Sequence, residues 1–170
     1  MTVQKTTEKD IEPVLALFDE ARKTIAALGI DQWQNGYPNR EAVLEDMANS
    51  GSYCIVDENG LCGTFAIIEN GEPTYDIIID GHWLSGDESN NYIALHRVAV
   101  SVQMRGKGVA TEIVRFAVDC AKRLGRASVR IDTHKGNVVM RRMLEKNGFS
   151  LCGTIFLASG APRVAYERLV

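Results

Sequence analysis

A glycine-rich loop between a strand-like run and an amphipathic stretch constrains the fold of this chain more than any other feature. The segment Gln103-Met104-Arg105-Gly106-Lys107-Gly108-Val109-Ala110 follows a β-branched run that ends at Val100, and the amphipathic stretch begins at Val109. A strand therefore leads into a loop that opens a helix. Glycines allow backbone N–H groups to crowd around an anion, and a helix N-terminus adds unpaired N–H groups and a positive dipole. Together with the charges of Arg105 and Lys107, the loop predicts a pyrophosphate site.

Two other interpretations of this loop are weaker. A Walker-type nucleotide loop requires Lys followed by Ser or Thr at its end, where this chain has Val109-Ala110. Gly106 and Gly108 could also form only a turn before a helix. The two cations interleaved with these glycines favour phosphate binding over a plain turn.

Length and composition narrow the class of protein. The 170 residues predict a single domain, 1–170, that is long enough to bury a core. The net charge of −3 argues against nucleic acid as a partner. Because no apolar run approaches about 20 residues, we expect no membrane partner, and the first residues lack the apolar segment of a signal peptide. The four cysteines have no C-x-x-C spacing, so we expect no metal, reduced buried thiols and a cytoplasmic location.

Hydrophobic periodicity predicts helices and strands along the whole chain. A helix begins after a capping box at Thr7 and Asp10 and ends at Gly29. An aromatic loop, 30–39, follows, and 70–91 is a loop-rich excursion. The other expected helices are Arg40–Ala48, Val109–Leu124 and Asn137–Asn147. The expected strands are Tyr53–Val56, Gly63–Ile68, Tyr92–Val100, Ser128–Thr133, Phe149–Leu157 and Val164–Arg168. This order mixes hairpins with crossovers, which predicts an α/β fold with a mixed sheet and helices on both faces.

Residues 92–149 resemble the GNAT superfamily of acyl-CoA-dependent N-acetyltransferases. The family's loop motif, Q/R-x-x-G-x-G/A, is matched by Gln103, Gly106 and Gly108. The strand His96-Arg97-Val98-Ala99-Val100 is similar to the family's splayed fourth strand. Asn137 and Lys146-Asn147-Gly148-Phe149 match the family's later helix. The resemblance implies the GNAT fold, in which a mixed, mostly antiparallel sheet of six to seven strands is splayed between its fourth and fifth strands.

The resemblance also implies a reaction and a cofactor. GNAT enzymes transfer an acetyl group from acetyl-CoA to a primary amine, here of a small molecule or a peptide, by direct attack in a ternary complex. Asn137, which is also expected to cap its helix, would contact the cofactor. The cofactor residues implied for this chain are Val98, Ala99, Val100, Gln103, Met104, Arg105, Gly106, Lys107, Gly108, Val109, Ala110, Thr111, Asn137 and Met140.

His96 is the first candidate for a catalytic base. Amine acetylation requires a neutral amine, yet alkylamines have pKa values of about 8 to about 10.4. Imidazole suits a base that works near neutral pH, and several GNAT enzymes carry their base on this strand. The alternative is a half-buried histidine bonded to a backbone carbonyl. His134 is a weaker candidate, because Asp132-Thr133-His134 could simply form the following turn.

The acceptor side of the reaction is less defined. Trp33, Gln34 and Tyr37 lie in a loop that covers the acceptor site in many members of the superfamily, although aromatic residues there can equally plug a small core. The family often has a tyrosine as general acid where this chain has Leu144, and Tyr37, Tyr166 or a water could replace it. That departure supports an alternative function, a non-catalytic acyl-CoA-binding regulator. A homodimer is the assembly that we consider.

Overall fold

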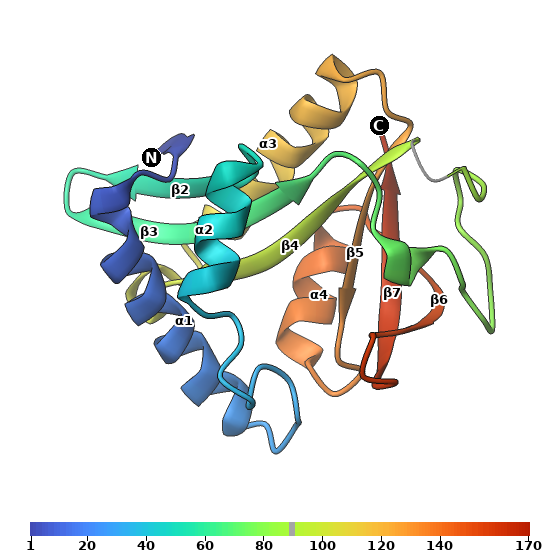
Figure 1. The fold of residues 1–170 in the computed structure, drawn as a ribbon, viewed down its shortest axis with the longest axis horizontal. Helices are drawn as coiled ribbons and strands as arrows, with labels where there is room; N and C mark the ends of the chain where they lie inside the picture. Colours follow the sequence, from blue (N-terminus) through green and yellow to red (C-terminus); the bar gives the residue numbers. More distant parts are fainter. Residues whose placement is uncertain (89–90) are drawn as a thin grey trace. The chain divides into compact units, whose positions relative to one another are not determined.

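The computed structural model describes residues 1–88 and 91–170 (Figure 1). Within these ranges the helices are α1 (Ile11–Ala26), α2 (Arg40–Ala48), α3 (Val109–Arg123) and α4 (Val138–Lys146). The strands are β1 (Thr2–Lys5), β2 (Ser52–Asp57), β3 (Gly60–Ile68), β4 (Tyr92–Val100), β5 (Ser128–Thr133), β6 (Ser150–Phe156) and β7 (Pro162–Leu169). Short 3-10 turns lie at Glu8–Asp10, Pro73–Tyr75 and Val102–Met104.

The strands form a mixed, mostly antiparallel sheet in the order β1-β2-β3-β4-β5-β7-β6. β4 and β5 run parallel and pair only from Tyr92–Ala94 to Ser128–Arg130, although both strands continue beyond that point. The pairs β1/β2, β2/β3, β5/β7 and β6/β7 are antiparallel. The expected GNAT topology is therefore confirmed.

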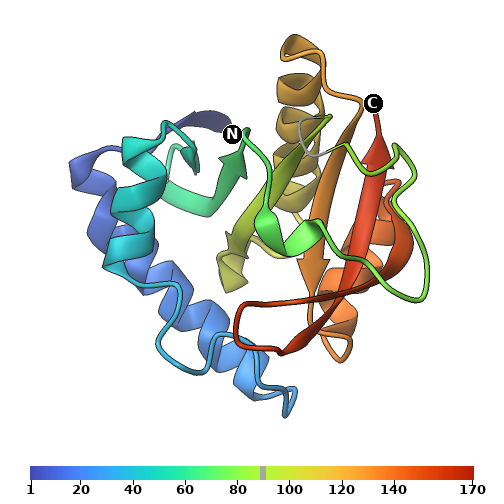
Figure 2. The same cartoon turned by 45° about the vertical axis from the view of Figure 1, so that its right-hand side comes forward.

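The chain forms two compact units, which share β4 and α3. The first unit comprises 1–67 and 97–113, and the second comprises 68–96 and 114–170. In the first unit α1 and α2 lie beside β2 and β3 (Figures 1 and 2). Their core cluster consists of Ile11, Val14, Leu17, Phe18, Val43, Cys54 and Ala99. Helices cover both faces of this part of the sheet, because α3 packs on the opposite side.

Gly63 shows how closely α3 approaches that opposite face. It pairs with Ile55 and so lies on the other side of the sheet from Cys54. A Cβ at Gly63 would lie 3.1 Å from Val109 Cγ1 and 3.0 Å from the Ala99 carbonyl oxygen. The missing side chain therefore lets α3 begin directly against β3 and β4.

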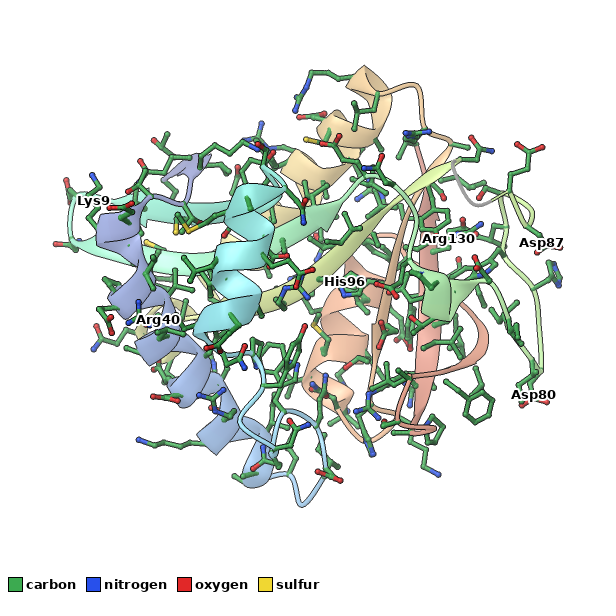
Figure 3. All side chains as sticks on the ribbon, viewed as in Figure 1. Lys9, Arg40, Asp80, Asp87, His96 and Arg130 are labelled. Atoms are coloured by element: carbon green, nitrogen blue, oxygen red, sulfur yellow. The ribbon has the colours of Figure 1, made fainter. Side chains whose placement is uncertain are left out.

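The second unit is built on β5, β7 and β6, which lie side by side in both views. Its core cluster consists of Tyr75, Trp83, Tyr92, Ala94, Cys152, Ile155 and Ala165. A buried ion pair lies beside this cluster: Arg130 Nε donates to Glu167 Oε1 at 2.9 Å, and both residues are at most 1% exposed (Figure 3 labels Arg130). The Arg130 guanidinium carbon lies 4.2 Å from the Trp83 ring and 4.0 Å from the Tyr92 ring.

Most expected elements are confirmed, with differences in detail. α1 ends at Ala26 rather than at Gly29, and β3 begins at Gly60 rather than at Gly63. The sequence pattern missed β1, because Val3 is the only apolar residue in this short edge strand. The capping box at Thr7 and Asp10 is present, but it caps the 3-10 turn before α1. The excursion 70–91 contains a 3-10 turn and a bridge between Ile79 and Thr154. Positions 89 and 90 of that predicted excursion lie outside the described residues.

Two further expectations concern membranes and thiols. Within the described ranges, no helix is long and apolar enough to cross a membrane. Cys54, Cys62, Cys120 and Cys152 are buried thiols, and none of them forms a disulfide in the part of the chain that the structure describes, as the sequence predicted.

Candidate functional site

The backbone of the glycine-rich loop, which we call the cradle, is open and has two glycines at positive φ. Gly106 and Gly108 adopt φ angles of +75° and +86°, and a Cβ at either would meet nothing within 4 Å. The N–H groups of Arg105 and Lys107 donate to carbonyls within the loop, at 3.3 and 3.2 Å. Among the described residues, no backbone acceptor takes the N–H of Gly106 or Gly108. Because α3 begins at Val109, its first N–H groups also lack a partner within the helix.

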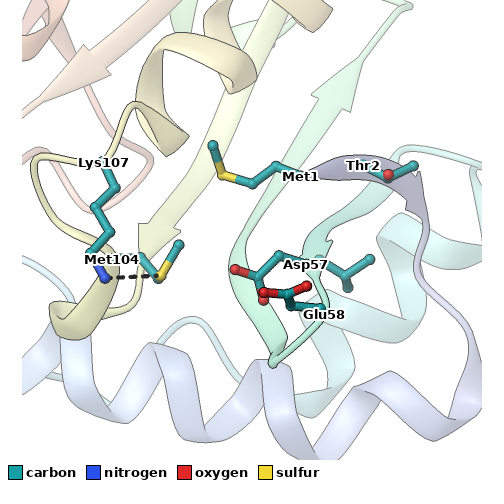
Figure 4. Close-up of a pocket in the computed structure, with 7 residues that line it drawn as sticks. Met1, Thr2, Asp57, Glu58, Met104 and Lys107 are labelled. Carbon is teal, nitrogen blue, oxygen red and sulfur yellow. Dashed lines mark hydrogen bonds between the residues drawn. The ribbon is translucent and has the colours of Figure 1, made fainter.

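Two hydrogen bonds with α1 side chains hold this loop against α1, and both of its cations are exposed. Val102 N donates to Glu20 Oε1 at 3.0 Å, and Arg105 Nη2 donates to Thr24 Oγ1 at 2.9 Å. The Arg105 partner is neutral, so its charge is not cancelled by a carboxylate there. Lys107 is exposed, with Nζ 4.0 Å from Met104 Sδ (Figure 4).

Met104 and Lys107 also line an open pocket of about 490 Å³. The other residues around it are Met1, Thr2, Val56, Asp57 and Glu58 (Figure 4). Gln103 and Thr111 are exposed, and Ala110 is half-buried. The predicted cofactor residues from Val98 to Thr111 therefore all lie in the first unit, next to accessible surface.

Arg97 interrupts the extended backbone of β4 just before these residues. Its φ is +52°, a value that is uncommon outside glycine. Arg97 Nε donates to Asp46 Oδ2 at 2.6 Å, Nη2 also contacts Asp46, and Nη1 donates to Tyr37 Oη at 2.6 Å. Burial opposes the charge, but Tyr37 and Asp46 outweigh it and raise the pKa of Arg97. This network holds the irregular backbone and links β4 to α2 and to the aromatic loop.

His96 lies in the second unit among groups that the sequence did not identify. Its Nε2 is 3.6 Å from Glu72 Oε2 and 3.4 Å from Tyr75 Oη (Figure 3 labels His96). Tyr75 Oη donates to Asp132 Oδ1 at 2.8 Å, and the Tyr75 and His96 rings stack at 5.8 Å. Burial, and then the Asp132 carboxylate, raise the pKa of Tyr75 well above its ordinary value.

Glu72 and Tyr75 come from the segment that was predicted only as a loop. The Glu72 side chain caps the 3-10 turn Pro73–Tyr75, so a carboxylate directly before a proline was a signal for a turn start. Asp132, which the sequence analysis considered only as part of a turn, accepts the Tyr75 hydroxyl near the end of β5. No local pattern indicates that Glu72 and Tyr75 lie beside His96, or that Asp132 accepts the Tyr75 hydroxyl.

His134, the second histidine candidate, forms a hydrogen bond within the loop between β5 and α4. His134 Nδ1 accepts the N–H of Gly136 at 3.0 Å, which favours the structural interpretation. The predicted cap is confirmed: Asn137 Oδ1 accepts the N–H of Met140 at 3.2 Å. His134, Asn137 and Met140 belong to the second unit.

The candidate acids differ in how their hydroxyl protons are used. Leu144, at the position where the family often has a general-acid tyrosine, is fully buried. Tyr166 Oη accepts from Arg141 Nε at 2.9 Å and donates to Glu145 Oε1 at 3.1 Å, so its proton is engaged. Tyr37 Oη accepts from Arg97, which leaves the phenol proton able to donate elsewhere.

The other two residues of the aromatic loop support its structure. Trp33 packs edge-on against Phe18 with ring centroids 5.7 Å apart, at the border of the core cluster of the first unit. Gln34 Nε2 donates to the carbonyls of Arg22 and Gln32 at 3.2 and 2.9 Å. These contacts favour packing for Trp33 and Gln34, and they leave Tyr37 as the loop residue joined to β4.

Comparison with known proteins identifies the family to which this fold belongs. Residues 16–149 match the family described as Acetyltransferase (GNAT) family. A GNAT acetyltransferase from Streptococcus agalactiae superimposes with a TM-score of 0.89 at 33% identity, over 99% of this chain and 95% of that one. A Salmonella typhimurium protein solved with its cofactor acetyl-CoA has the same fold, with a TM-score of 0.69 at 14% identity over 99% and 92% of the two chains.

Curated sequences give a shorter match. An uncharacterized N-acetyltransferase from Methanocaldococcus jannaschii is 31% identical over 75 residues, which is 44% of this chain and 32% of the relative. The match thus spans about a third of that relative's length. The family match covers most of the chain, and the streptococcal protein matches nearly end to end. The chain therefore belongs to the GNAT family of acetyltransferases.

Proposed function

We propose that this protein transfers the acetyl group of acetyl-CoA to a primary amine of a small molecule or a peptide, by direct attack in a ternary complex. The observation that carries the proposal is the position of His96. It is an imidazole beside a carboxylate, on the strand that runs directly into the glycine-rich cradle. Family membership supports the acetyl donor, and His96 supports the proton transfer that amine acylation requires.

The residues of the cradle fit a pyrophosphate. Gly106 and Gly108 leave the space above the loop open, and the start of α3 contributes N–H groups and a positive dipole end. Arg105 and Lys107 add two cations. The Salmonella structure with acetyl-CoA supports this donor for the shared fold. We propose that Val98–Val100 bind the amide-rich arm through backbone groups, with Asn137 and Met140 as further contacts.

Bound acetyl-CoA supplies a thioester whose carbonyl carbon an amine can attack. His96 takes the proton that the amine nitrogen loses as the C–N bond forms. The C–S bond then breaks, and the sulfur leaves as a thiolate that needs one proton. Tyr37 is the acid we favour at that step, because Arg97 donates to its oxygen and the O–H remains able to donate.

Two further parts of the proposal concern the residues that contact the acceptor amine and the cellular location of the protein. Tyr37 is also the loop residue that we propose for acceptor contact, with Trp33 and Gln34 shaping the loop around it. Four buried free thiols support a cytoplasmic location.

The proposal is tested by measuring release of free CoA thiol with a panel of amines from about pH 6 to about pH 9. We expect His96→Ala to lower kcat about 100-fold near neutral pH, as for loss of a general base. His82→Ala is the matched control, because His82 is exposed in a loop. A full rate for His96→Ala across this range would rule out the base assignment. Acetyl-CoA binding without turnover of any amine would instead support the regulator.

A further inference from the structure

We infer that Glu72 is a positioning residue for His96: its carboxylate holds the imidazole with the proton on Nε2, so that Nδ1 carries the basic lone pair. This inference rests on the proposed function, in which His96 accepts the proton of the amine. It adds which ring nitrogen acts and which residue selects it.

Two oxygens face Nε2, and both can only accept a hydrogen bond from it. Glu72 Oε2 lies at 3.6 Å, and an ionised carboxylate has no donor. Tyr75 Oη lies at 3.4 Å, and its hydrogen is donated to Asp132 Oδ1 at 2.8 Å. An unprotonated Nε2 would place its lone pair against both oxygens. A protonated Nε2 can donate to Tyr75 Oη and is attracted by the Glu72 carboxylate, and the stacked Tyr75 ring restrains the imidazole in this orientation.

Glu72 is itself held so that one oxygen remains for His96. Its Oε1 accepts the N–H of Thr74 at 3.2 Å and the Thr74 hydroxyl at 2.9 Å. Its backbone N–H donates to Tyr92 Oη at 2.8 Å, and Tyr92 lies on β4, as His96 does. The side chains of Glu72 and His96 are only 20% and 17% exposed. The carboxylate is therefore fixed to the strand that carries the base and is partly shielded from water, which strengthens its interaction with the imidazole.

This arrangement favours the charged product of proton transfer. When the amine proton binds Nδ1, the imidazolium faces the Glu72 carboxylate directly. It also faces Asp132 through the Tyr75 hydroxyl. These three residues, from the 3-10 turn and from β5, supply two negative charges and one dipole. The bond between Nε2 and its hydrogen does not change, so Glu72 acts without contacting the substrate.

The tautomer is directly measurable in the unmodified protein. Two-bond ¹H–¹⁵N spectra of histidine-labelled protein distinguish a protonated Nε2 from a protonated Nδ1, and His96→Gln identifies the signals of His96. We expect neutral His96 to carry its proton on Nε2. A neutral His96 with the proton on Nδ1 would overturn the inference, whatever the activity assay shows.

Glu72→Gln reverses the local chemistry with little change in shape. The Gln oxygen can keep both contacts with Thr74, and its amide then presents a donor to Nε2. We expect the proton to move to Nδ1 in the spectrum and kcat to fall about 100-fold, while KM for acetyl-CoA stays within about twofold. The matched control is Glu69→Gln, the same change at an exposed position, which should alter neither the tautomer nor kcat.

The outcomes separate this inference from the function on which it rests. A full rate for His96→Ala would show that His96 is not the catalytic base. A protonated Nε2 would then be a property of a histidine with a structural role only. A second outcome is that His96→Ala loses activity while Glu72→Gln keeps both the wild-type tautomer and kcat. That result would support His96 as the base and reject Glu72 as its positioning residue. If Glu72→Gln does not fold, the wild-type spectrum still decides the tautomer.

Discussion

Removing one partner of the buried Arg130–Glu167 pair should destabilise the protein strongly. Five donors converge on the Glu167 carboxylate, and Gln in its place would present an NH₂ group to some of them. The donors to Oε1 are Arg130 Nε at 2.9 Å and the Ser128 and Ser85 hydroxyls at 2.6 Å each. The donors to Oε2 are the backbone N–H groups of Leu84 and of Ser85, the latter at 3.2 Å. Since a buried charge would also lose its partner, Glu167→Gln should lower the free energy of unfolding by about 3–5 kcal/mol.

Arg130→Met should have a cost of similar size. The guanidinium also donates to the Gly86 carbonyl at 2.6 Å and lies between the rings of Trp83 and Tyr92. Cation–π contacts of a desolvated guanidinium contribute up to about 2 kcal/mol each, and the uncompensated Glu167 carboxylate adds its own penalty. Replacing both residues, as Arg130→Met with Glu167→Leu, removes both charges. The double variant should therefore be more stable than the sum of the single effects predicts, by about 2 kcal/mol or more.

The measurement is urea unfolding followed by circular dichroism, with Glu12→Gln as the matched control. Glu12 pairs with Arg40, but its side chain is 74% exposed, so its loss should change stability by less than about 1 kcal/mol. A cost below about 1 kcal/mol for Glu167→Gln, or strict additivity in the double variant, would refute this reasoning.

The same pair makes stability depend on pH. Burial alone would raise the pKa of Glu167, but the Ser128 and Ser85 hydroxyls and the Arg130 guanidinium outweigh it and lower the pKa below its usual value. The ionised carboxylate therefore stabilises the fold above its unfolded pKa of about 4.3. That stabilisation is lost as the pH falls through the lower folded pKa. The stability difference between wild type and Glu167→Gln should accordingly shrink in acid.

Three further predictions concern the cradle, the acid and a thiol. Gly106→Asp should weaken acetyl-CoA binding by calorimetry at least about 100-fold. Gly160→Asp is the matched control, because Gly160 has a φ of +84° and equally open space, and this variant should keep the wild-type affinity. Equal affinity of both variants for acetyl-CoA would contradict the assignment of the cradle as the pyrophosphate site. Tyr37→Phe should lower kcat about 10-fold or more, whereas Tyr166→Phe should leave kcat unchanged. A loss of kcat in Tyr166→Phe alone would instead identify Tyr166 as the acid. Burial and Glu167 raise the pKa of Cys152 to about 11. Only about 0.1% is thus thiolate at pH 8, so alkylation of folded protein, followed by mass spectrometry, should spare it.

Local patterns predicted the second half of the chain closely. β4 and β5 have the expected bounds, because each is a short apolar segment with a clear start and stop. In the first half, α2 also has the expected bounds, since Asn39 marks its start. Asn137 caps α4 as expected, since capping depends on residues only three apart. β1 escaped the analysis because its pairing with β2, rather than its own composition, makes it a strand.

The candidate site likewise has one part formed by consecutive residues and another formed by residues that are distant in the sequence. The cradle could be predicted from the sequence because its glycines, its cations and the helix that follows are consecutive. The surroundings of His96 were not, because Tyr75 approaches it from 21 residues away and Glu72 belongs to the same distant turn. Arg97 likewise finds Asp46 across 51 residues. Contacts of this kind leave no periodicity or spacing in the sequence.

The amino-acid sequence by itself determined the order of the elements after β1 and the family resemblance, and it predicted the anion cradle, because these depend on neighbouring residues and on backbone conformation. Tertiary structure alone decided which oxygens face His96, which tyrosine keeps a hydroxyl proton to donate, and that Arg130 and Glu167 are buried together. Those features arise when folding within each unit brings distant side chains together in partly dry surroundings. There, charge and hydrogen bonding depend on geometry that only the folded chain defines.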